Sequence, residues 1–391
     1  MTVRIRRQIA IFSFCLQAWA FLFPAAFSQT SAPPLKETRR SETLAPGIEH
    51  LEILRGDFSA GTETDRWTIN VLLLDPKRAR LILARAMDEV VGAETTSSLA
   101  SRHGALAAVN GGYFRTTGTY RGEPAGMLAL GNKVLSEPSL SRSELAISNA
   151  GGLTRIAVAQ IKVKVDIVVD GKESLSINGI NRPREENELI IFTPEFHRTT
   201  LTAPDGIEVL VERGRVVALR EGAGSQPIPP EGCVLSATGT AGQWAREHLQ
   251  AGDRVEVRTE IAADPPLAFS PDFIVGGGPH LVTAGKPLAA AAEAEQFKED
   301  FSRSRHPRTA AGVRDDGFLV LVTVDGRQPK KSVGMTISEL TGLVLELGCV
   351  EAINLDGGGS TTMVIKNRVV NSPSDAADER PVSDALLIFR R

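Results

Sequence analysis

The hydrophobic pattern in the last third of the chain predicts a strand, a helix and a second strand in succession. Apolar runs at residues 318–324 and 350–355 have the length of buried strands. Between them, apolar residues recur three and four positions apart, which is the spacing of one helix face: Leu340, Leu343, Val344 and Leu347. Such a β-α-β connection makes its two strands parallel, so both strands should end at the same edge of a sheet.

The ends of these elements can also be read from the sequence. Thr336 and Glu339 have the spacing of a capping box at the start of the helix, and Gly348 is a typical helix stop. Asp325 follows the first strand and Asp356 follows the second. If the strands are neighbours, the two carboxylates lie close together at the edge where parallel α/β units bind ligands.

The rest of the chain is also rich in strand patterns. Residues 67–74 and 79–86 are β-like runs, and a short helix capped by Thr95 or Thr96 should precede a strand at 105–109. From about 128 to 262, short strands alternate with turn signals. We therefore expect an α+β fold, with a mixed β-sheet core, a β-α-β unit in the C-terminal third and a β-rich middle region.

The N-terminal residues have the features of a secretory signal. Residues 1–28 contain a basic start, an apolar stretch too short for most spanning helices and small residues at the end. We predict a cleaved signal peptide, with an uncleaved anchor as the alternative. Residues 29–46 are then a flexible leader and residues 47–391 the folded domain. The protein would be exported, periplasmic or extracellular, without a transmembrane segment after cleavage.

Charge and cysteine usage narrow the choice of partners. The net charge is −3, and residues 1–28 carry three Arg and no acidic residue, so the remaining chain is near −6. No basic stripe remains, which argues against nucleic acid as a partner. Cys233 and Cys349 could pair or remain two buried thiols. No Cys/His cluster has metal-ligand spacing. The carboxylates of Asp325 and Asp356 could bind a Ca²⁺ or Mg²⁺ ion, and this alternative stays open.

A glycine loop follows the last predicted strand of the β-α-β unit. It reads Asn354-Leu-Asp-Gly-Gly-Gly-Ser-Thr361. Glycines let backbone N–H groups approach a ligand, so this loop suits an anionic substrate. The alternative is a tight turn with a capping Asp. The loop lacks the Lys of a nucleotide-binding P-loop.

Other polar residues also stand at strand ends. Asn110 and Tyr113 lie in a second glycine loop, where Tyr113 could contact a sugar or simply pack. Arg308 and Arg327 suit a phosphate through their forked donors, with surface salt bridges as the alternative. His306 could be an acid or base, or a plain loop residue.

Five motifs, taken in their order along the chain, resemble the phosphodiester glycosidase domain. They are Asn110–Phe114, Gly276–Pro279, Arg305–Thr309, Val324–Arg327 and Asn354–Thr361. The resemblance spans roughly residues 50–391 and is greatest to uncharacterised bacterial members. The family includes the enzyme that uncovers mannose 6-phosphate on lysosomal enzymes.

The resemblance implies a hydrolase that cleaves the glycosidic C–O bond between a sugar and a phosphodiester, releasing free sugar and a phosphomonoester. Asp356 and Asp325 would be the catalytic carboxylates, in an order that the sequence does not assign. The carbohydrate phosphodiester would be bound by Asn110, Tyr113, Arg308, Thr309, Arg327, Asn354, Gly357, Gly358, Gly359, Ser360 and Thr361. The alternatives are a metal-dependent phosphodiesterase that cuts P–O, and a glycan-binding protein without turnover.

Overall fold

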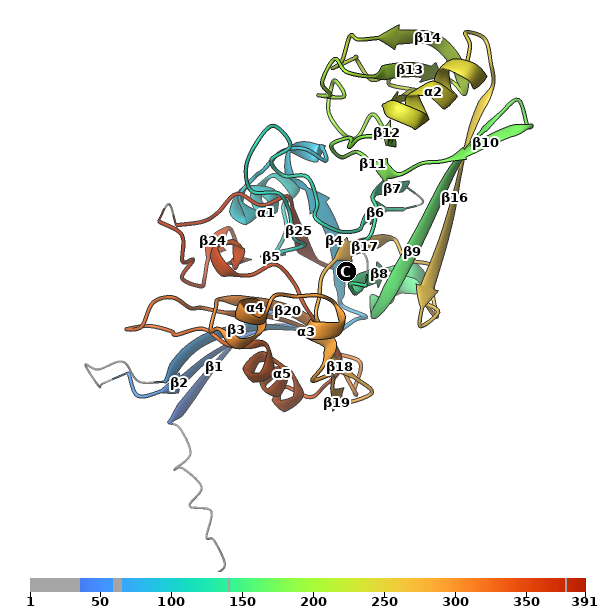
Figure 1. Cartoon of the computed structure of the whole chain (residues 1–391). Helices are drawn as coiled ribbons and strands as arrows, with labels where there is room; N and C mark the ends of the chain where they lie inside the picture. The colour runs from blue at the N-terminus through green and yellow to red at the C-terminus, as the bar shows by residue number, and fades with distance from the viewer. Residues whose placement is uncertain (1–35, 59–64, 132, 140, 377) are drawn as a thin grey trace, which may run out of the picture. The chain divides into compact units, whose positions relative to one another are not determined.

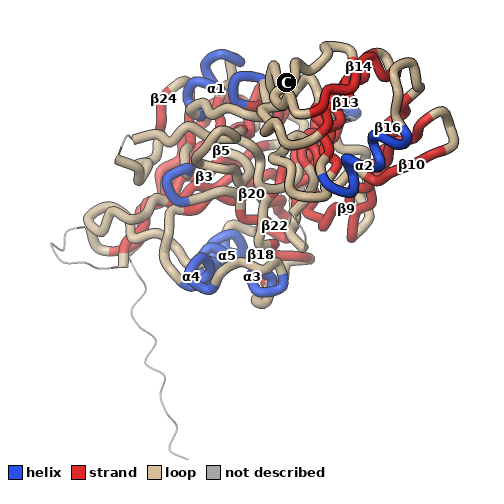
Figure 2. The backbone as a smooth tube through the Cα atoms, turned by 45° about the horizontal axis from the view of Figure 1, so that its top comes forward, coloured by secondary structure: helices blue, strands red, loops and turns tan. Residues whose placement is uncertain are grey.

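The computed structural model describes residues 36–58, 65–131, 133–139, 141–376 and 378–391. It is 46% strand and 13% helix, which confirms the expected α+β class. The predominance of strands is visible in Figure 2. Among the described residues, no helix is long and apolar enough to cross a membrane.

The main sheet has eight strands in the order β1-β2-β3-β21-β20-β22-β18-β19. Their bounds are β1 Glu37–Ala45, β2 Ile48–Gly56, β3 Arg66–Leu74, β18 His280–Thr283, β19 Lys286–Pro287, β20 Arg308–Arg314, β21 Leu319–Val324 and β22 Cys349–Asn354. A second sheet has the order β24-β23-β5-β25-β4. Its bounds are β4 Ala79–Arg85, β5 Ala107–Asn110, β23 Met363–Ile365, β24 Arg368–Val369 and β25 Asp384–Arg390.

The two sheets share one core because alternate side chains of each strand point to opposite faces. Leu319 and Leu321 of β21 pack in the same cluster as Leu386 and Ile388 of β25. The opposite faces are covered by helices. Helix α5 (Ile337–Glu346) packs on the main sheet, and α1 (Thr96–His103) packs on the second sheet (Figure 1). The layers are therefore helix, sheet, sheet and helix.

The predicted β-α-β unit exists as β21, α5 and β22. The capping box of Thr336 and Glu339 is present, and Leu340, Leu343 and Val344 are buried on the inner face of α5. Burying each of these side chains contributes about 2 kcal/mol, which holds the helix on the sheet.

The two strands of this unit are not neighbours, so the condition under which Asp325 and Asp356 would lie close together is not met. β20 lies between β21 and β22 and pairs antiparallel with both. β21 and β22 are consequently parallel and still end at one edge of the sheet. Because β20 runs the other way, its first residue, Arg308, starts at that same edge, between the two strand ends.

The middle region is β-rich, as the turn pattern indicated. It contains β6 Leu128–Leu130, β7 Lys133–Ser136, β8 Glu144–Ser148, β9 Arg155–Val169, β10 Glu173–Ser176, β11 Gly179–Ile180, β12 Leu189–Phe192, β13 Ile207–Glu212, β14 Arg215–Glu221, β15 Gly232–Ala237, α2 Gly239–His248 and β16 Val255–Asp264. β17 (Phe273–Gly276) joins β6 and β8 in one sheet. The long antiparallel pair β9 and β16 is prominent in Figure 1.

Three further sequence expectations concern the chain start and the cysteines. The predicted signal peptide, residues 1–28, lies outside the described residues. Residues 37–45, which we placed in the leader, form β1 along β2. All but the last two of these nine residues are exposed, so their polar pattern carried no strand signal. Cys233 and Cys349 are both buried free thiols, which leaves the paired alternative without support.

Candidate active site

The ends of strands from both sheets meet through the side chain of Asn110. Asn110 closes β5 and is fully buried. Its Nδ2 donates to the backbone O of Asp356 at 2.7 Å, and its Oδ1 accepts from Thr309 Oγ1 at 2.8 Å and from the N–H of Thr362 at 3.1 Å. One amide thus joins the second sheet to β20 and to the glycine loop after β22.

Thr309 and Thr361 belong to the same buried network. The hydroxyl of Thr309 lies 3.5 Å from the hydroxyl of Thr361, and both residues are buried. Because the Thr309 hydroxyl donates to Asn110, this network links β20 to the glycine loop. The predicted role of Thr309 and Thr361 in substrate binding stays a prediction.

Tyr113 and Asn354 form a second polar junction. The Tyr113 hydroxyl donates to the O of Gly278 at 2.8 Å, and Asn354 Nδ2 donates to the Tyr113 oxygen at 2.7 Å. Burial raises the pKa of Tyr113, and the nearby Asp356 raises it further, so the phenol stays a neutral donor. The Oδ1 of Asn354 is buried and has no partner among the described residues. A buried acceptor of this kind normally requires a donor, which a bound ligand can supply.

Asp356 occupies a half-buried position at the start of the glycine loop. Its Oδ1 accepts from the N–H of Gly357 at 2.9 Å. Burial raises the pKa of this carboxyl to about 6, against the lowering effects of Ser360, Gly357 and Arg380. Near neutral pH the group is therefore ionised but more basic than an ordinary aspartate.

A second carboxylate beside Asp356 was missed by the sequence analysis. Asp384 begins β25, is buried, and accepts from the N–H of Gly112 at 2.9 Å and from Ser383 Oγ at 2.6 Å. Its charge contributes to the raised pKa of Asp356. The only sequence signal was a Ser-Asp pair at the start of an apolar strand, which is common.

Asp325 lies at the predicted edge, and its carboxylate accepts hydrogen bonds from Ser372 and Asn371. Both carboxylate oxygens accept from the N–H of Ser372 at 3.0 Å, and Oδ1 also accepts from Asn371 Nδ2 at 3.0 Å. Asn371 Nδ2 donates in turn to the O of Thr361 at 3.0 Å. Asp325 is 2% exposed, and burial raises its pKa to about 6. Its link to the glycine loop therefore runs through Asn371.

Arg308 is 1% exposed and has no carboxylate partner among the described residues. Its guanidinium donates to three main-chain carbonyls: Met335 at 2.8 Å, Phe301 at 2.6 Å and Ser304 at 3.1 Å. It also lies over the ring of Phe301, 4.7 Å from the centroid. Burial lowers the pKa of Arg308 to about 10, and the nearby Arg327 adds to the lowering. A buried cation without a counter-ion is costly, and an anionic ligand relieves that cost.

Arg327 is exposed and lies over the glycine loop. Its Nη2 is 3.4 Å from Nδ1 of His306. A Cβ added to Gly358 would come within 3.1 Å of the same guanidinium. The pKa of His306 is lowered by burial and then by Arg308 and Arg327, which favours the neutral imidazole. The structure thus gathers two arginines and one histidine beside the loop that follows Asp356.

The far side of the loop is held by an ion pair that the sequence did not indicate. Arg380 donates to Asp375 through Nε at 2.6 Å and Nη2 at 2.9 Å, and its Nη1 lies 3.5 Å from the buried Ser360 hydroxyl. A Cβ on Gly359 would overlap this pair, at 2.0 Å from Asp375 Oδ1. Gly357 likewise faces the O of Pro307 at a distance that excludes a Cβ.

An aromatic group that includes Tyr113 covers one side of the site. Phe297 and Phe301 stack with centroids 4.7 Å apart, and Tyr113 contacts Phe297 at 5.9 Å and Phe301 at 6.3 Å. Arg142 lies over the Phe297 ring at 4.3 Å, whereas Arg308 lies over the Phe301 ring. Sequence spacing gave no signal for these contacts because the residues come from three separate segments.

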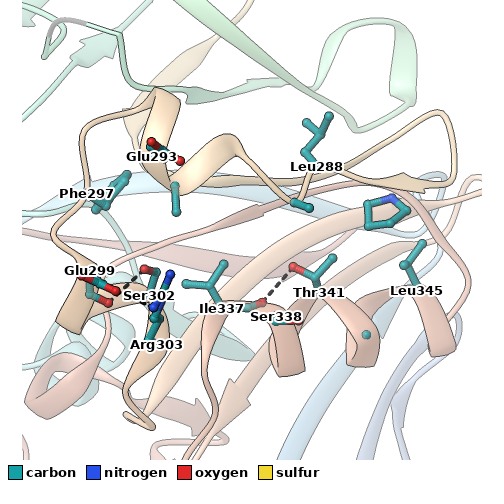
Figure 3. Close-up of a pocket in the computed structure, with 14 residues that line it drawn as sticks. Leu288, Glu293, Phe297, Glu299, Ser302, Arg303, Ile337, Ser338, Thr341 and Leu345 are labelled. Atoms are coloured by element: carbon teal, nitrogen blue, oxygen red, sulfur yellow. Dashed lines mark hydrogen bonds and ion pairs between the residues drawn. The ribbon is translucent and has the colours of Figure 1, made fainter.

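A hollow of about 700 Å³ lies on another side of Phe297, between the segment with α3 (Ala291–Ala294) and α4 (Glu299–Arg303) and helix α5 (Figure 3). None of the predicted site residues lines it. Its walls include Phe297, Glu299, Arg303, Ile337, Thr341 and Leu345. In the described part of the chain, no three His, Cys, Asp or Glu side chains are grouped so that they could hold a metal ion.

The comparisons with known proteins address the family. The family model described as phosphodiester glycosidase matches residues 205–389. The predicted resemblance to this family is confirmed over this stretch, which is a little under half of the chain. It includes Arg308, Asp325, Asp356 and Asp384, while Asn110 and Tyr113 lie before it.

Relatives with curated names match shorter segments. The bovine N-acetylglucosamine-1-phosphodiester alpha-N-acetylglucosaminidase is 40% identical over 90 residues, which is 22% of this chain and 17% of that protein. The SPbeta prophage-derived uncharacterized protein YomE of Bacillus subtilis is 45% identical over 84 residues, 22% of this chain and 13% of that protein. The aligned parts therefore span less than a fifth of either relative.

A solved structure matches nearly the whole chain. It is a Burkholderia pseudomallei protein described as exported, with a TM-score of 0.82 and 25% identity, and the match covers 96% of this chain and all of that one. The fold of this chain is therefore shared by another bacterial protein.

The glycine loop provides a direct test of the site's geometry. Gly358 has φ +61°, and an added Cβ would press on Arg327. We expect Gly358→Ala to cost about 1–2 kcal/mol of stability and to lower kcat/KM by more than that loss explains, because Arg327 must move. Thermal melts and steady-state kinetics measure the two effects.

Gly342 in α5 is the matched control, because an added Cβ there meets nothing within 4 Å. Gly342→Ala should keep activity and gain some stability, since alanine favours a helix. Equal behaviour of the two variants would contradict a constrained loop under Arg327.

Proposed function

We propose that this protein is an exported hydrolase that cleaves a sugar-1-phosphodiester at the glycosidic C–O bond. The products are a free sugar and a phosphomonoester. The observation that carries the proposal is Arg308, a buried cation without a carboxylate partner among the described residues, next to the Tyr113 and Asn354 junction. The family match over residues 205–389 supports the same reaction class.

The cationic groups account for recognition of the phosphate. Arg308 and Arg327 lie on the side of the glycine loop where Gly358 has no side chain. Their positive charge favours the dianionic phosphomonoester that forms as the C–O bond breaks. Because the second pKa of a phosphomonoester is about 6, this group leaves without a strong general acid.

Asp356 is the better of the two predicted carboxylates for the reacting role. It is half-buried and accepts from one backbone N–H, that of Gly357, whereas both oxygens of Asp325 accept from the N–H of Ser372. We assign Asp356 as the nucleophile, or as the base for water, at the anomeric carbon. Asp325 is then a positioning residue that holds Asn371 and, through it, the loop.

The neutral groups would orient the sugar. Tyr113 stays protonated, and the unpaired Oδ1 of Asn354 can accept a hydrogen bond from a sugar hydroxyl. The rings of Phe297 and Phe301 pack against the ring of Tyr113. The walls of the site are thus fixed before the substrate arrives, which favours catalysis.

A panel of sugar-1-phosphodiesters tests the reaction class. We expect at least one member, with N-acetylglucosamine 1-phosphodiesters first, to release equal amounts of free sugar and phosphomonoester. Assays with and without a chelator show whether a Ca²⁺ or Mg²⁺ ion takes part. Binding without any product would instead support a glycan-binding protein.

Export belongs to the same proposal. The signal-like residues 1–28 and the Burkholderia protein of similar fold that is described as exported support it. Fractionation of cells that express the full chain should find the protein outside the cytoplasm, shortened at its N-terminus. Full-length protein in the cytoplasm would contradict it.

A further inference from the structure

A second hollow, of about 680 Å³, lies beside the candidate site along the edge of β9. Its walls come from the segment after β7, from β9 and from the segment around β11. Its lining residues include Glu137, Arg142, Lys162, Val163, Asn178 and Arg182. None of the predicted site residues lines it, and the proposed reaction assigns it no role.

β9 changes its strand partner at this hollow. β8 pairs with residues 155–159 and β10 with residues 166–169, while β16 follows the other edge from 160 to 169. Between β8 and β10, this edge of β9 therefore has no strand partner among the described residues.

The backbone of β9 offers hydrogen-bonding groups in that gap. The N–H of Ile161 donates to the Glu144 carboxylate at 2.9 Å, and the O of Val165 accepts from the N–H of Ile177 at 2.8 Å. Alternate residues of an antiparallel strand direct their N–H and C=O groups to the same side. The backbone groups of Val163 consequently face the hollow, where they can bind hydroxyl groups.

Arg142 connects this hollow to the candidate site. It lines the hollow, and its guanidinium carbon lies 4.3 Å from the centroid of Phe297 and 5.7 Å from that of Tyr113. One flat face is stacked on the aromatic group, which fixes the fork. Among the described residues, none accepts a hydrogen bond from the guanidinium or pairs with its charge.

The walls of this hollow carry more unpaired positive charge than unpaired negative charge, which favours an anionic ligand. Arg182 is neutralised by ion pairs with Glu137 and Glu188. Lys162 is exposed on β9 and, like Arg142, has no ion pair in the described part of the chain. The Glu137 carboxylate in this hollow is paired with Arg182, so it does not neutralise Arg142 or Lys162. These two cations attract phosphate or carboxylate groups.

We propose that the β9 hollow is a subsite for a second anionic group of the substrate, attached beyond the phosphodiester that is cleaved. The ligand is then an anionic saccharide chain with two or more charged groups rather than a small diester. This inference rests on the proposed function, because it extends the substrate of the same site. Arg142 would hold the second anion, and Val163 and Asn178 would bind the hydroxyl groups between the two charges.

Two matched substrates test the subsite. One is N-acetylglucosamine 1-(methyl phosphate), and the other carries glycerol phosphate in place of the methyl group. We expect the wild type to have a higher kcat/KM for the second compound than for the first. Arg142→Gln should reduce this preference by about tenfold, and Lys162→Gln should reduce it by a smaller factor. Lys172→Gln, in the exposed β9–β10 turn, is the charge-matched control and should keep the preference.

Binding measured by calorimetry with Asp356→Asn separates the subsite from the reaction. The same preference should appear in the dissociation constants of the two compounds. An unchanged preference in both Arg142→Gln and Lys162→Gln would overturn the subsite. Charge-selective binding without hydrolysis of either compound by the wild type would count against the proposed reaction and still support the subsite.

Discussion

Asp356→Asn is expected to reduce kcat by about 10³-fold while substrate binding is largely kept. Asparagine has nearly the same shape and can still accept from the N–H of Gly357, but it can neither attack the anomeric carbon nor take a proton from water. Steady-state kinetics give the loss of turnover, and calorimetry with the intact diester gives the affinity.

The pH dependence of the wild type follows from the same carboxyl. Its pKa is raised to about 6, and the reacting form is the carboxylate. We expect kcat/KM to fall below about pH 6, with an acid limb that reflects one proton. Because the diester stays ionised throughout this range, the limb belongs to the enzyme. Activity that stays constant down to pH 4 would contradict the assignment of Asp356.

As the pH rises through the pKa of Asp356, the stability contributed by this carboxyl should fall while the activity rises. A carboxyl whose native pKa lies above its unfolded value of 3.8 binds its proton more tightly in the folded state. Its contribution to stability is thus present at low pH and is lost as the pH rises from about 4 to 6. Above pH 6, the buried charge costs up to about 3 kcal/mol, which Asp356→Asn removes.

We therefore expect the Asp356→Asn variant to melt at least as high as the wild type at pH 8, with a smaller advantage at pH 4. Asp315→Asn, on an exposed turn, is the control and should change neither stability nor activity. A variant that is both inactive and clearly less stable at pH 8 would indicate a structural role for Asp356.

Arg308→Ala is the second change with a large expected effect. It removes the buried cation on the phosphate side, so kcat/KM for a sugar-1-phosphodiester should fall by about 10²-fold or more. Recognition of a neutral glycoside of the same sugar should fall much less, because no phosphate charge is involved. Competition binding with the two compounds gives the comparison even if the neutral glycoside is not turned over.

The same change also affects folding. Three carbonyls, of Met335, Phe301 and Ser304, would lose their donor, whereas the cost of an unpaired charge would disappear. Arg308→Lys keeps the charge and loses the fork, and should recover part of the affinity for the diester. Arg303→Ala, an exposed arginine of α4, is the control. Equal losses for the diester and the neutral glycoside would remove the phosphate role from Arg308.

Local signals in the sequence were sufficient for the elements and for one edge of the site. The capping box at Thr336 and the spacing of Leu340 and Leu343 were enough to predict α5 from the local sequence. The insertion of β20 between β21 and β22 could not be predicted, because strand order depends on long-range pairing. It nevertheless moved Arg308 to the edge that the parallel strands had already defined.

The roles of individual side chains were less predictable than their positions. Asn110 and Thr309 are brought together by the fold and hydrogen-bond each other, a contact that the sequence did not indicate. Asp384, Arg380 and Arg142 reach the site through tertiary packing, and their neighbours in the sequence give no motif. Burial and hydrogen-bond saturation decide such roles, and neither is encoded in local spacing.

The position of the cleaved bond tests the central claim most directly. The wild type is incubated with an N-acetylglucosamine 1-phosphodiester in ¹⁸O-water, and the ¹⁸O content of each product is measured by mass spectrometry. The reaction proposed for Asp356 and Arg308 puts the label on the anomeric oxygen of the sugar and leaves the phosphomonoester unlabelled. Label on the phosphate would show cleavage of P–O and would contradict it.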